Sequence, residues 1–135
     1  MTPRQRWMAL LEGRRPDRIP TDYQATAEVT ARLLPDLVDR VGIEVLNPIQ
    51  WRCPGMQREG LVRDFGDRII FHGSIDNQQT LAFGSVDDVV AEVRESIEIY
   101  RPARWICAPC HNIQPISPTE NIVAMYKAVH DYGRS

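Results

Sequence analysis

The chain has 135 residues, 43% of them hydrophobic, and a formal net charge of -2 at pH 7. This length fits one globular domain, and the near-neutral charge offers no field that would gather nucleic acid or anionic lipid. No segment approaches the roughly 18 consecutive apolar residues of a membrane span, and the apolar run "WMALL" is shorter than the core of an export signal. We therefore predict a cytoplasmic protein without nucleic-acid or membrane partners, whose cysteines are thiols.

The first half of the chain alternates helical and strand patterns. Its predicted elements, in chain order, are a helix over 3–13, a strand over 18–23, a helix over 25–41 and a strand over 42–51. Gly13 ends the first helix, and Pro35 is expected to kink or divide the second. The near-continuous apolar centre of the segment 42–51 favours a strand that is covered on both faces.

The second half continues this alternation. Its predicted elements are a helix over 54–67, a strand over 68–75, a helix over 85–100, a strand over 104–109 and a helix over 117–133. Gly66 closes the first of these helices. Ser85 and Asp88 give the second a start that resembles a capping box. Pro118 lies in the first turn of the third, and Gly133 is its predicted C-cap.

Together these elements predict one α/β domain over residues 1–135, with an N-terminal helix followed by four βα units on a parallel sheet. Such sheets place their functional residues in the loops beyond the carboxyl ends of the strands. Polar segments follow all four predicted strands, namely "TDYQAT", "NPIQWRCPGM", "HGSIDNQQT" and "PCHNIQP". We therefore expect a small-molecule site at this edge of the sheet.

One short motif suggests a different chemistry. Cys107, Cys110 and His111 have the spacing C-x-x-C-H, which is the attachment signature of a c-type haem. Covalent haem attachment takes place after export, and this chain carries no export signal that we recognise, so no c-type haem is expected. Cys107 lies inside a predicted strand, where a small buried side chain is the simplest interpretation.

Long segments resemble the uroporphyrinogen decarboxylase superfamily. The opening "MTPRQRWMALLEGRRPDRIPTDY" is similar to the N-terminal helix and first barrel strand of that family, and "ATAEVTARLLPDL" is similar to the next helix in a methyltransferase-like branch. Residues 1–40 thus resemble the family's N-terminus, and residues 41–135 resemble its last three βα units. On this basis "PCHNIQP" resembles the loop after the eighth strand, which makes His111 the position of interest.

The resemblance implies half of a (β/α)8 TIM barrel. A closed barrel typically needs about 250 residues, and here the first unit is followed directly by a segment that resembles the sixth. Because the eighth strand of a closed barrel neighbours the first, the units would lie in the order six, seven, eight, one. Open edges and an uncovered face favour a homodimer or a complementing chain that restores eight strands. The alternatives are an open four-stranded layer and a deletion remnant that depends on another chain.

The superfamily includes two reactions. One is the cofactor-free decarboxylation of uroporphyrinogen, and the other is methyl transfer between a methylated corrinoid and a thiol activated by zinc. The decarboxylases carry an arginine-rich segment after the first strand, and "TDYQATAEVT" contains no arginine here. The methyltransferase-like branch therefore fits better, with a corrinoid as co-substrate.

The usual zinc ligands from the middle of the barrel are absent from this chain. The substitute metal set is His111, Cys53 and His72, which with water would form an open catalytic zinc site. In the alternative interpretation, His72 is a hydrogen-bonded strand histidine and Cys53 is a loop thiol.

The resemblance and the strand ends together give the candidate site residues. The catalytic candidates are His111, Asp22 and Asp76, and the substrate-binding candidates are Tyr23, Asn77, Gln78, Asn112 and Gln114. Solvated loops are the alternative for these polar side chains.

Three functions follow from these observations. The first is a methyltransferase-type enzyme that is active only as an assembled barrel. The second is a decarboxylase-like tetrapyrrole enzyme, which would need arginines that converge on the pocket. The third is a non-catalytic remnant or binding subunit.

Overall fold

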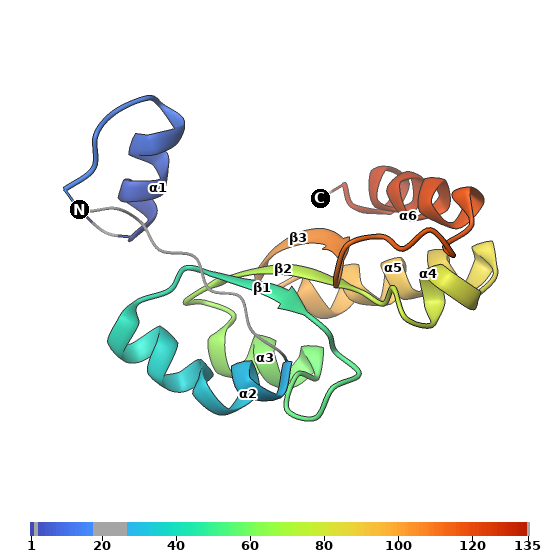
Figure 1. Cartoon of the computed structure of the whole chain (residues 1–135), viewed down its shortest axis with the longest axis horizontal. Coiled ribbons are helices and arrows are strands. Elements are labelled where there is room, and N and C mark those ends of the chain that lie inside the picture. The colour runs from blue at the N-terminus through green and yellow to red at the C-terminus, as the bar shows by residue number, and fades with distance from the viewer. Residues whose placement is uncertain (2, 18–26, 135) are drawn as a thin grey trace.

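The computed structural model describes residues 1, 3–17 and 27–134. Its elements are α1 (Pro3–Leu11), α2 (Ala27–Asp36), η1 (Leu37–Val41, a π-helix), β1 (Val45–Ile49), α3 (Arg58–Phe65), β2 (Ile70–Ile75), α4 (Thr80–Phe83), α5 (Val86–Tyr100), β3 (Arg104–Pro109) and α6 (Thr119–Tyr132) (Figure 1). The predicted α/β class is confirmed. The predicted strand over 18–23 lies outside the described residues. None of the described helices has both the length and the hydrophobicity to cross a membrane.

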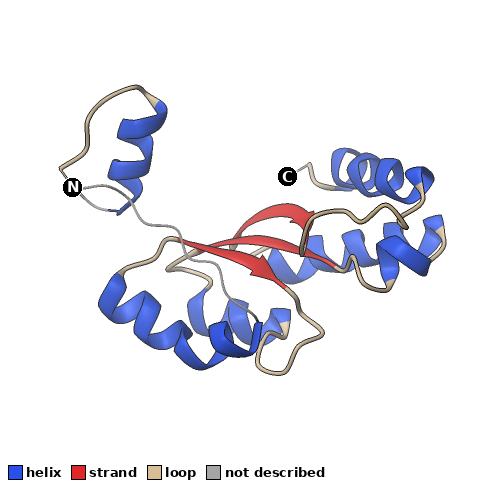
Figure 2. Cartoon of the chain, in the orientation of Figure 1, coloured by secondary structure: helices blue, strands red, loops and turns tan. Residues whose placement is uncertain are grey.

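The described strands form a single three-stranded sheet in the order β1-β2-β3, and both strand pairs are parallel (Figure 2). Helix α3 connects β1 to β2, and α4 and α5 connect β2 to β3. Because the strands are parallel, their carboxyl ends meet at one edge of the sheet, which we call the carboxyl edge. The arrangement is that of consecutive βα units of a barrel.

Local signals set most of the helix boundaries. Ser85 and Asp88 form the predicted capping box of α5, and Gly66 ends α3 as predicted. Pro35 lies inside α2, and the helix changes to π-helical geometry at Leu37. A proline removes one intrahelical hydrogen bond, which accounts for this division of the predicted helix. The four-residue helix α4 was not predicted, because its segment TLAF is a single turn and too short to show a helical period.

Helices cover one face of the sheet, which we call the outer face. Leu46, Ile49 and Phe71 belong to a core cluster with α2, η1 and α3. A second cluster joins α4, α5 and α6 to Ile75, the last residue of β2. Trp105 packs against both clusters, and its ring stacks on Tyr100 with 4.9 Å between the ring centroids. The hydrophobic core therefore lies between the outer face and the helices.

The opposite face, which we call the inner face, carries Val45 of β1, Ile70 and His72 of β2, and Ile106 of β3. The strand register places Ile70 beside Val45 and His72 beside Ile106. None of these four side chains belongs to a core cluster in the described part of the chain, and Ile106 is 47% exposed. The described residues therefore cover the strand over 42–51 on one face, whereas cover on both faces was expected.

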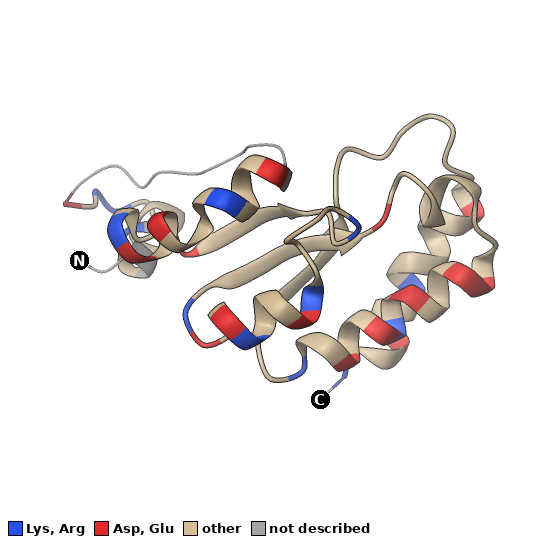
Figure 3. Ribbon diagram, turned by 90° about the horizontal axis from the view of Figure 1, so that it is seen from below, with Lys and Arg blue, Asp and Glu red and all other residues tan. Residues whose placement is uncertain are grey.

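The inner face is also almost free of charge. Among the described residues, charge is concentrated on the helices and loops, and Arg104 at the start of β3 is the one charged residue within the three described strands (Figure 3). The register places Arg104 beside Ile70, so it lies on the inner face at the start of the sheet. His72 and Asn47 form a polar centre, where Nδ1 of His72 lies 3.0 Å from Oδ1 of Asn47 across the strands. The inner face is thus an apolar surface with a small polar centre and one charged residue at its edge.

Helix α2 does not take the position that the order six, seven, eight, one implies. That order would place it beyond β3, next to α6, whereas α2 and η1 pack under β1 beside α3 (Figure 1). Only residues 42–44 connect η1 to β1. Three residues span at most about 10 Å, and the far side of β3 lies about three strand spacings, or roughly 14 Å, from β1. The short connection therefore fixes the helix at the β1 edge.

Because α2 packs closely against Gly55, adding a side chain at that residue should cause a steric clash. Gly55 has φ +80°, and a Cβ added there would lie 2.8 Å from Cβ of Ala31 in α2. We expect Gly55→Ala to lower the free energy of unfolding by about 2 kcal/mol, from backbone strain and overpacking together. Ala31→Gly alone should cost about 1 kcal/mol, because it places a glycine inside α2. The double variant should be about 1 kcal/mol more stable than the sum of the two single losses predicts, as measured in a double-mutant cycle by urea unfolding. Strict additivity of the two substitutions would contradict the position of α2.

Candidate functional site

Polar side chains gather at the carboxyl edge, where the three described strands end. Gln50 follows β1, Asp76 and Asn77 follow β2, and Cys110 follows β3. All four are buried, although each comes from a loop. Buried polar groups are costly unless they are hydrogen-bonded, so a connected network is expected among them.

A backbone irregularity positions the residues after β2. Gly73 and Ser74 both have positive φ angles, of 109° and 81°. Ser74 is fully buried, and its Oγ accepts a hydrogen bond of 3.2 Å from the Tyr100 hydroxyl. The two residues interrupt the alternation of the strand, and every residue from Gly73 to Asn77 is buried as a result. Asp76 is thereby turned into the protein rather than toward solvent.

Asp76 is the centre of the network. It is 0% exposed, and Arg52 donates from Nε to its Oδ2 at 2.5 Å. Its Oδ1 accepts from Nε2 of Gln50 at 3.2 Å and from the backbone N–H of Gln78 at 2.9 Å. Burial alone would raise the pKa of Asp76, but these donors and the Arg52 charge outweigh it and hold that pKa below its usual range. Asp76 is therefore an ionised carboxylate at neutral pH.

Cys110 connects this network to the loop after β3. Its thiol donates to Oδ1 of Asn77 at 2.8 Å and accepts from Nε2 of Gln50 at 3.1 Å. The Asn77 side chain in turn donates to the backbone carbonyl of Asn112 at 3.1 Å. Burial raises the pKa of Cys110 to about 11. The thiol therefore stays protonated at neutral pH and acts as a hydrogen-bonding group between loops.

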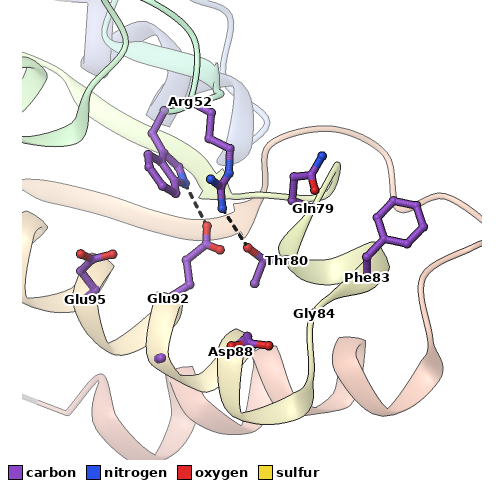
Figure 4. Close-up of a pocket in the computed structure, with 10 residues that line it drawn as sticks. Arg52, Gln79, Thr80, Phe83, Gly84, Asp88, Glu92 and Glu95 are labelled. Atoms are coloured by element: carbon purple, nitrogen blue, oxygen red, sulfur yellow. Dashed lines mark hydrogen bonds between the residues drawn. The ribbon is translucent and has the colours of Figure 1, made fainter.

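A pocket of about 620 Å³ adjoins the network, between the β1–α3 loop and helices α4 and α5 (Figure 4). Arg52 lies on one wall and Thr80 and Glu92 on another, while Phe83 lies at the rim. Trp51 also lines the pocket, and the guanidinium groups of Arg52 and Arg58 each lie over its ring, 4.4 Å from the ring centroid. These two cation–π contacts restrict the motion of this loop.

The structure brings some of the candidate residues together. Asp76 and Asn77 lie in the buried network. The side chains of Gln78, His111, Asn112 and Gln114 are exposed, and Nε2 of Gln114 donates to the Asn112 carbonyl. Asp22 and Tyr23 lie outside the described residues.

The three candidate zinc ligands are not brought together. Cys53 packs against the core cluster on the outer face, whereas His72 lies on the inner face beside Asn47, and His111 is exposed in the loop after β3. No group of three His, Cys, Asp or Glu residues in the described chain could hold a metal ion. The alternation of β2 explains the separation, because it turns His72 away from the side on which Cys53 lies. The described residues therefore do not fit a zinc site.

Sequence reasoning did not place Gln50, Arg52, Glu92 or Cys110 among the candidate site residues. Oε1 of Glu92 accepts from Nε1 of Trp51 at 2.9 Å and from the backbone N–H of Asp76 at 2.8 Å. A signal for Glu92 exists in the sequence, because it lies one helical turn from Val89 and Ser96, in the buried stripe of α5. Gln50 and Cys110 carry no comparable signal beyond their position at strand ends.

The burial of the thiols predicts an order of reactivity. Burial raises the pKa of all three cysteines, to about 12 for Cys107 and about 11 for Cys110, while Cys53 is the least buried. At pH 8 a thiol of pKa 11 is ionised in only about one molecule in a thousand. We expect iodoacetamide to label Cys53 first in the native protein and all three cysteines in denaturant, as read by peptide mass spectrometry. Equally fast native labelling of Cys110 would contradict the network.

The fold and the site together define a class: parallel βα units with helices on the outer face and a polar site at the carboxyl edge, consistent with part of a TIM-like barrel. The family model described as Uroporphyrinogen decarboxylase (URO-D) matches residues 28–132, and the chain belongs to this family. A search of curated proteins finds no match. The superfamily resemblance is thus confirmed, whereas the methyltransferase-like branch stays a prediction.

Proposed function

We propose that this chain is one half of a URO-D family barrel, which acts on a small molecule after a second copy of the chain completes the barrel. Four βα units predicted from the sequence are half of the eight that close a TIM barrel. The paired chains would enclose the inner faces and leave the carboxyl edges open for substrate.

The observation that supports this proposal is the inner face, which the described residues leave uncovered. Val45, Ile70 and Ile106 expose apolar surface to solvent, and β1 is an edge of the described sheet. In a closed barrel the corresponding side chains fill the interior, and every edge is paired. Association with a second chain would bury the exposed apolar face and pair the open strand edge.

Methyl transfer from a corrinoid to a thiol is the reaction we propose for the completed barrel. The carboxyl edge offers an exposed imidazole at His111 and exposed amides at Gln78, Asn112 and Gln114, which suit proton transfer and hydrogen bonding to substrate. Since the described residues of one chain do not fit a zinc site, we derive no step through zinc.

Decarboxylation of a tetrapyrrole is less favoured by the same geometry. Within the described loops of the carboxyl edge, residues 50–57, 76–79 and 110–118, arginine occurs only at Arg52. Its guanidinium group is already paired with Asp76, so little positive charge is left for the carboxylates of such a substrate. If neither reaction is detected, the remaining candidate function is that of a binding subunit without catalytic activity.

The proposal predicts a specific loss of activity. Methylcobalamin and a thiol would be supplied to the assembled protein, with demethylation followed by absorbance and uroporphyrinogen tested in parallel. We expect His111→Ala to lower the methyl-transfer rate about 100-fold, the contribution of a positioned acid or base. His130→Ala is the matched control, because His130 is also exposed but lies near the end of α6. Equal rates in the two variants, or turnover of uroporphyrinogen alone, would reject this reaction.

A further inference from the structure

Glu92 is a buried carboxylate whose position needs an explanation. It lies in the middle of α5, on the side that faces the sheet, and it is 7% exposed. A carboxylate at such a position loses most of its hydration, which destabilises the fold unless strong hydrogen bonds replace the lost water. An apolar residue would be the ordinary choice at this point of a helix.

The partners of Glu92 come from two different loops of the site. Its Oε1 accepts from Nε1 of Trp51 at 2.9 Å and from the backbone N–H of Asp76 at 2.8 Å. Figure 4 shows the Glu92 side chain reaching from α5 toward the loop that carries Arg52. One oxygen atom thus links the loop after β1, the loop after β2 and helix α5.

Both members of the Arg52–Asp76 ion pair are restrained by this link. Asp76 is held by the hydrogen bond from its own backbone N–H to Glu92, so the restraint acts on the same residue whose carboxylate pairs with Arg52. Arg52 is held through the Trp51 ring, on which its guanidinium group stacks at 4.4 Å. Hydrogen bonds to a charged acceptor are about twice as strong as neutral ones, so a carboxylate is well suited to fix two donors at once.

We propose that Glu92 is a positioning residue, which sets the geometry of the Arg52–Asp76 ion pair at the carboxyl edge from the outer helix α5. The inference deepens the proposed function and rests on it, since it assumes that this edge is the functional part of the barrel. The ion pair then has its working arrangement before any ligand arrives, because its two loops are fixed by a rigid helix.

The test compares two neutral substitutions of Glu92. Glu92→Gln keeps an acceptor oxygen, whereas Glu92→Ala keeps none, so their difference isolates the hydrogen bonds from the loss of charge. We expect the pKa of Asp76, followed by carboxyl ¹³C NMR, to be about one unit higher in Glu92→Ala than in Glu92→Gln, because the Arg52 contact loosens. The Trp51 indole N–H should stay protected from hydrogen exchange in Glu92→Gln and lose that protection in Glu92→Ala.

Two further variants keep the test decisive. Glu92→Leu fills the same space without an acceptor, and it replaces Glu92→Ala if that variant does not fold. Glu98→Ala is the matched control on the same helix, because Glu98 is exposed and pairs with Arg101. If the role of Glu92 is purely structural, its substitution should lower the melting temperature but leave the pKa of Asp76 the same in Glu92→Ala and Glu92→Gln. Equal pKa values in these two variants would overturn the proposal. The test needs neither substrate nor a second chain, so a monomeric protein that shows the pKa difference rejects only the proposed function.

Discussion

Replacing Asp76 with alanine is expected to lower the free energy of unfolding by about 2–3 kcal/mol. The substitution leaves the Arg52 guanidinium, the Gln50 amide and the Gln78 backbone N–H without their common acceptor. Removing one partner of a fully buried ion pair costs about 3–5 kcal/mol. The Arg52 side chain is 43% exposed and can recover part of its hydration, so the expected loss lies below that range. The difference in the free energy of unfolding between the two proteins is measured by urea unfolding at pH 7.

Asp64 provides the matched control for this experiment. It also pairs with an arginine, Arg63, whose hydrogen bond lowers the pKa of the Asp64 carboxyl, but both side chains are exposed. Surface ion pairs contribute little, so Asp64→Asn should leave stability nearly unchanged. A comparable loss in both variants would mean that the buried network around Asp76 adds nothing.

The same carboxylate gives stability a defined dependence on pH. The pKa of Asp76 is lower in the folded protein than its unfolded value of about 3.9. Its stabilisation is therefore complete above the unfolded pKa and is lost as the pH falls through the folded pKa. The wild-type protein should lose more stability than Asp76→Ala between pH 5 and pH 2, which urea unfolding across this range measures. Parallel pH profiles would contradict an ionised, hydrogen-bonded Asp76.

Replacing Ile106 with glutamate is expected to weaken the association of two chains strongly. Ile106 lies on the inner face and is already 47% exposed, so a charge there should disturb the isolated chain little. In a completed barrel the same carboxylate would be enclosed among apolar side chains, where an unpaired charge is strongly unfavourable. We expect the dissociation constant to rise roughly 100-fold or more, which corresponds to about 3 kcal/mol.

Val123 on α6 is the control for Ile106. It is 51% exposed, but it lies on a helix that packs on the outer face, away from the proposed interface. Val123→Glu should therefore associate like the wild-type chain in sedimentation velocity experiments. Dissociation by Val123→Glu with no effect of Ile106→Glu would place any interface on the helical side and reject the barrel.

The sequence patterns were sufficient for most elements and for the class of fold. Hydrophobic spacing and caps such as Ser85 identified the helices, and the apolar runs identified the described strands. The family order does not give the position of α2, because the three-residue connection to β1 decides it. Connection length is a local constraint, and it could have been read from the sequence once η1 and β1 were placed.

Of the residues that directly follow a strand, Asp76 and Asn77 were predicted as site residues and lie in the buried network, whereas Gln50 and Cys110 were not predicted. Glu92 was missed because it is distant in sequence and looks like an ordinary helical carboxylate, and its role depends on how α5 packs on the loops. From the sequence, all three candidate zinc ligands are expected near the same edge of the sheet. In the structure, the alternation of side chains along β2 separates Cys53 from His72.

The molecular mass of the purified protein in solution, measured by light scattering at micromolar concentration, tests the central claim most directly. The account predicts a uniform species with twice the mass of the chain, in which two copies complete one barrel. Metal content determined on the same sample would then show whether the assembled pair creates a zinc site that the described residues of one chain do not form. A uniform monomer would contradict the account, because its inner face would stay open and its barrel incomplete.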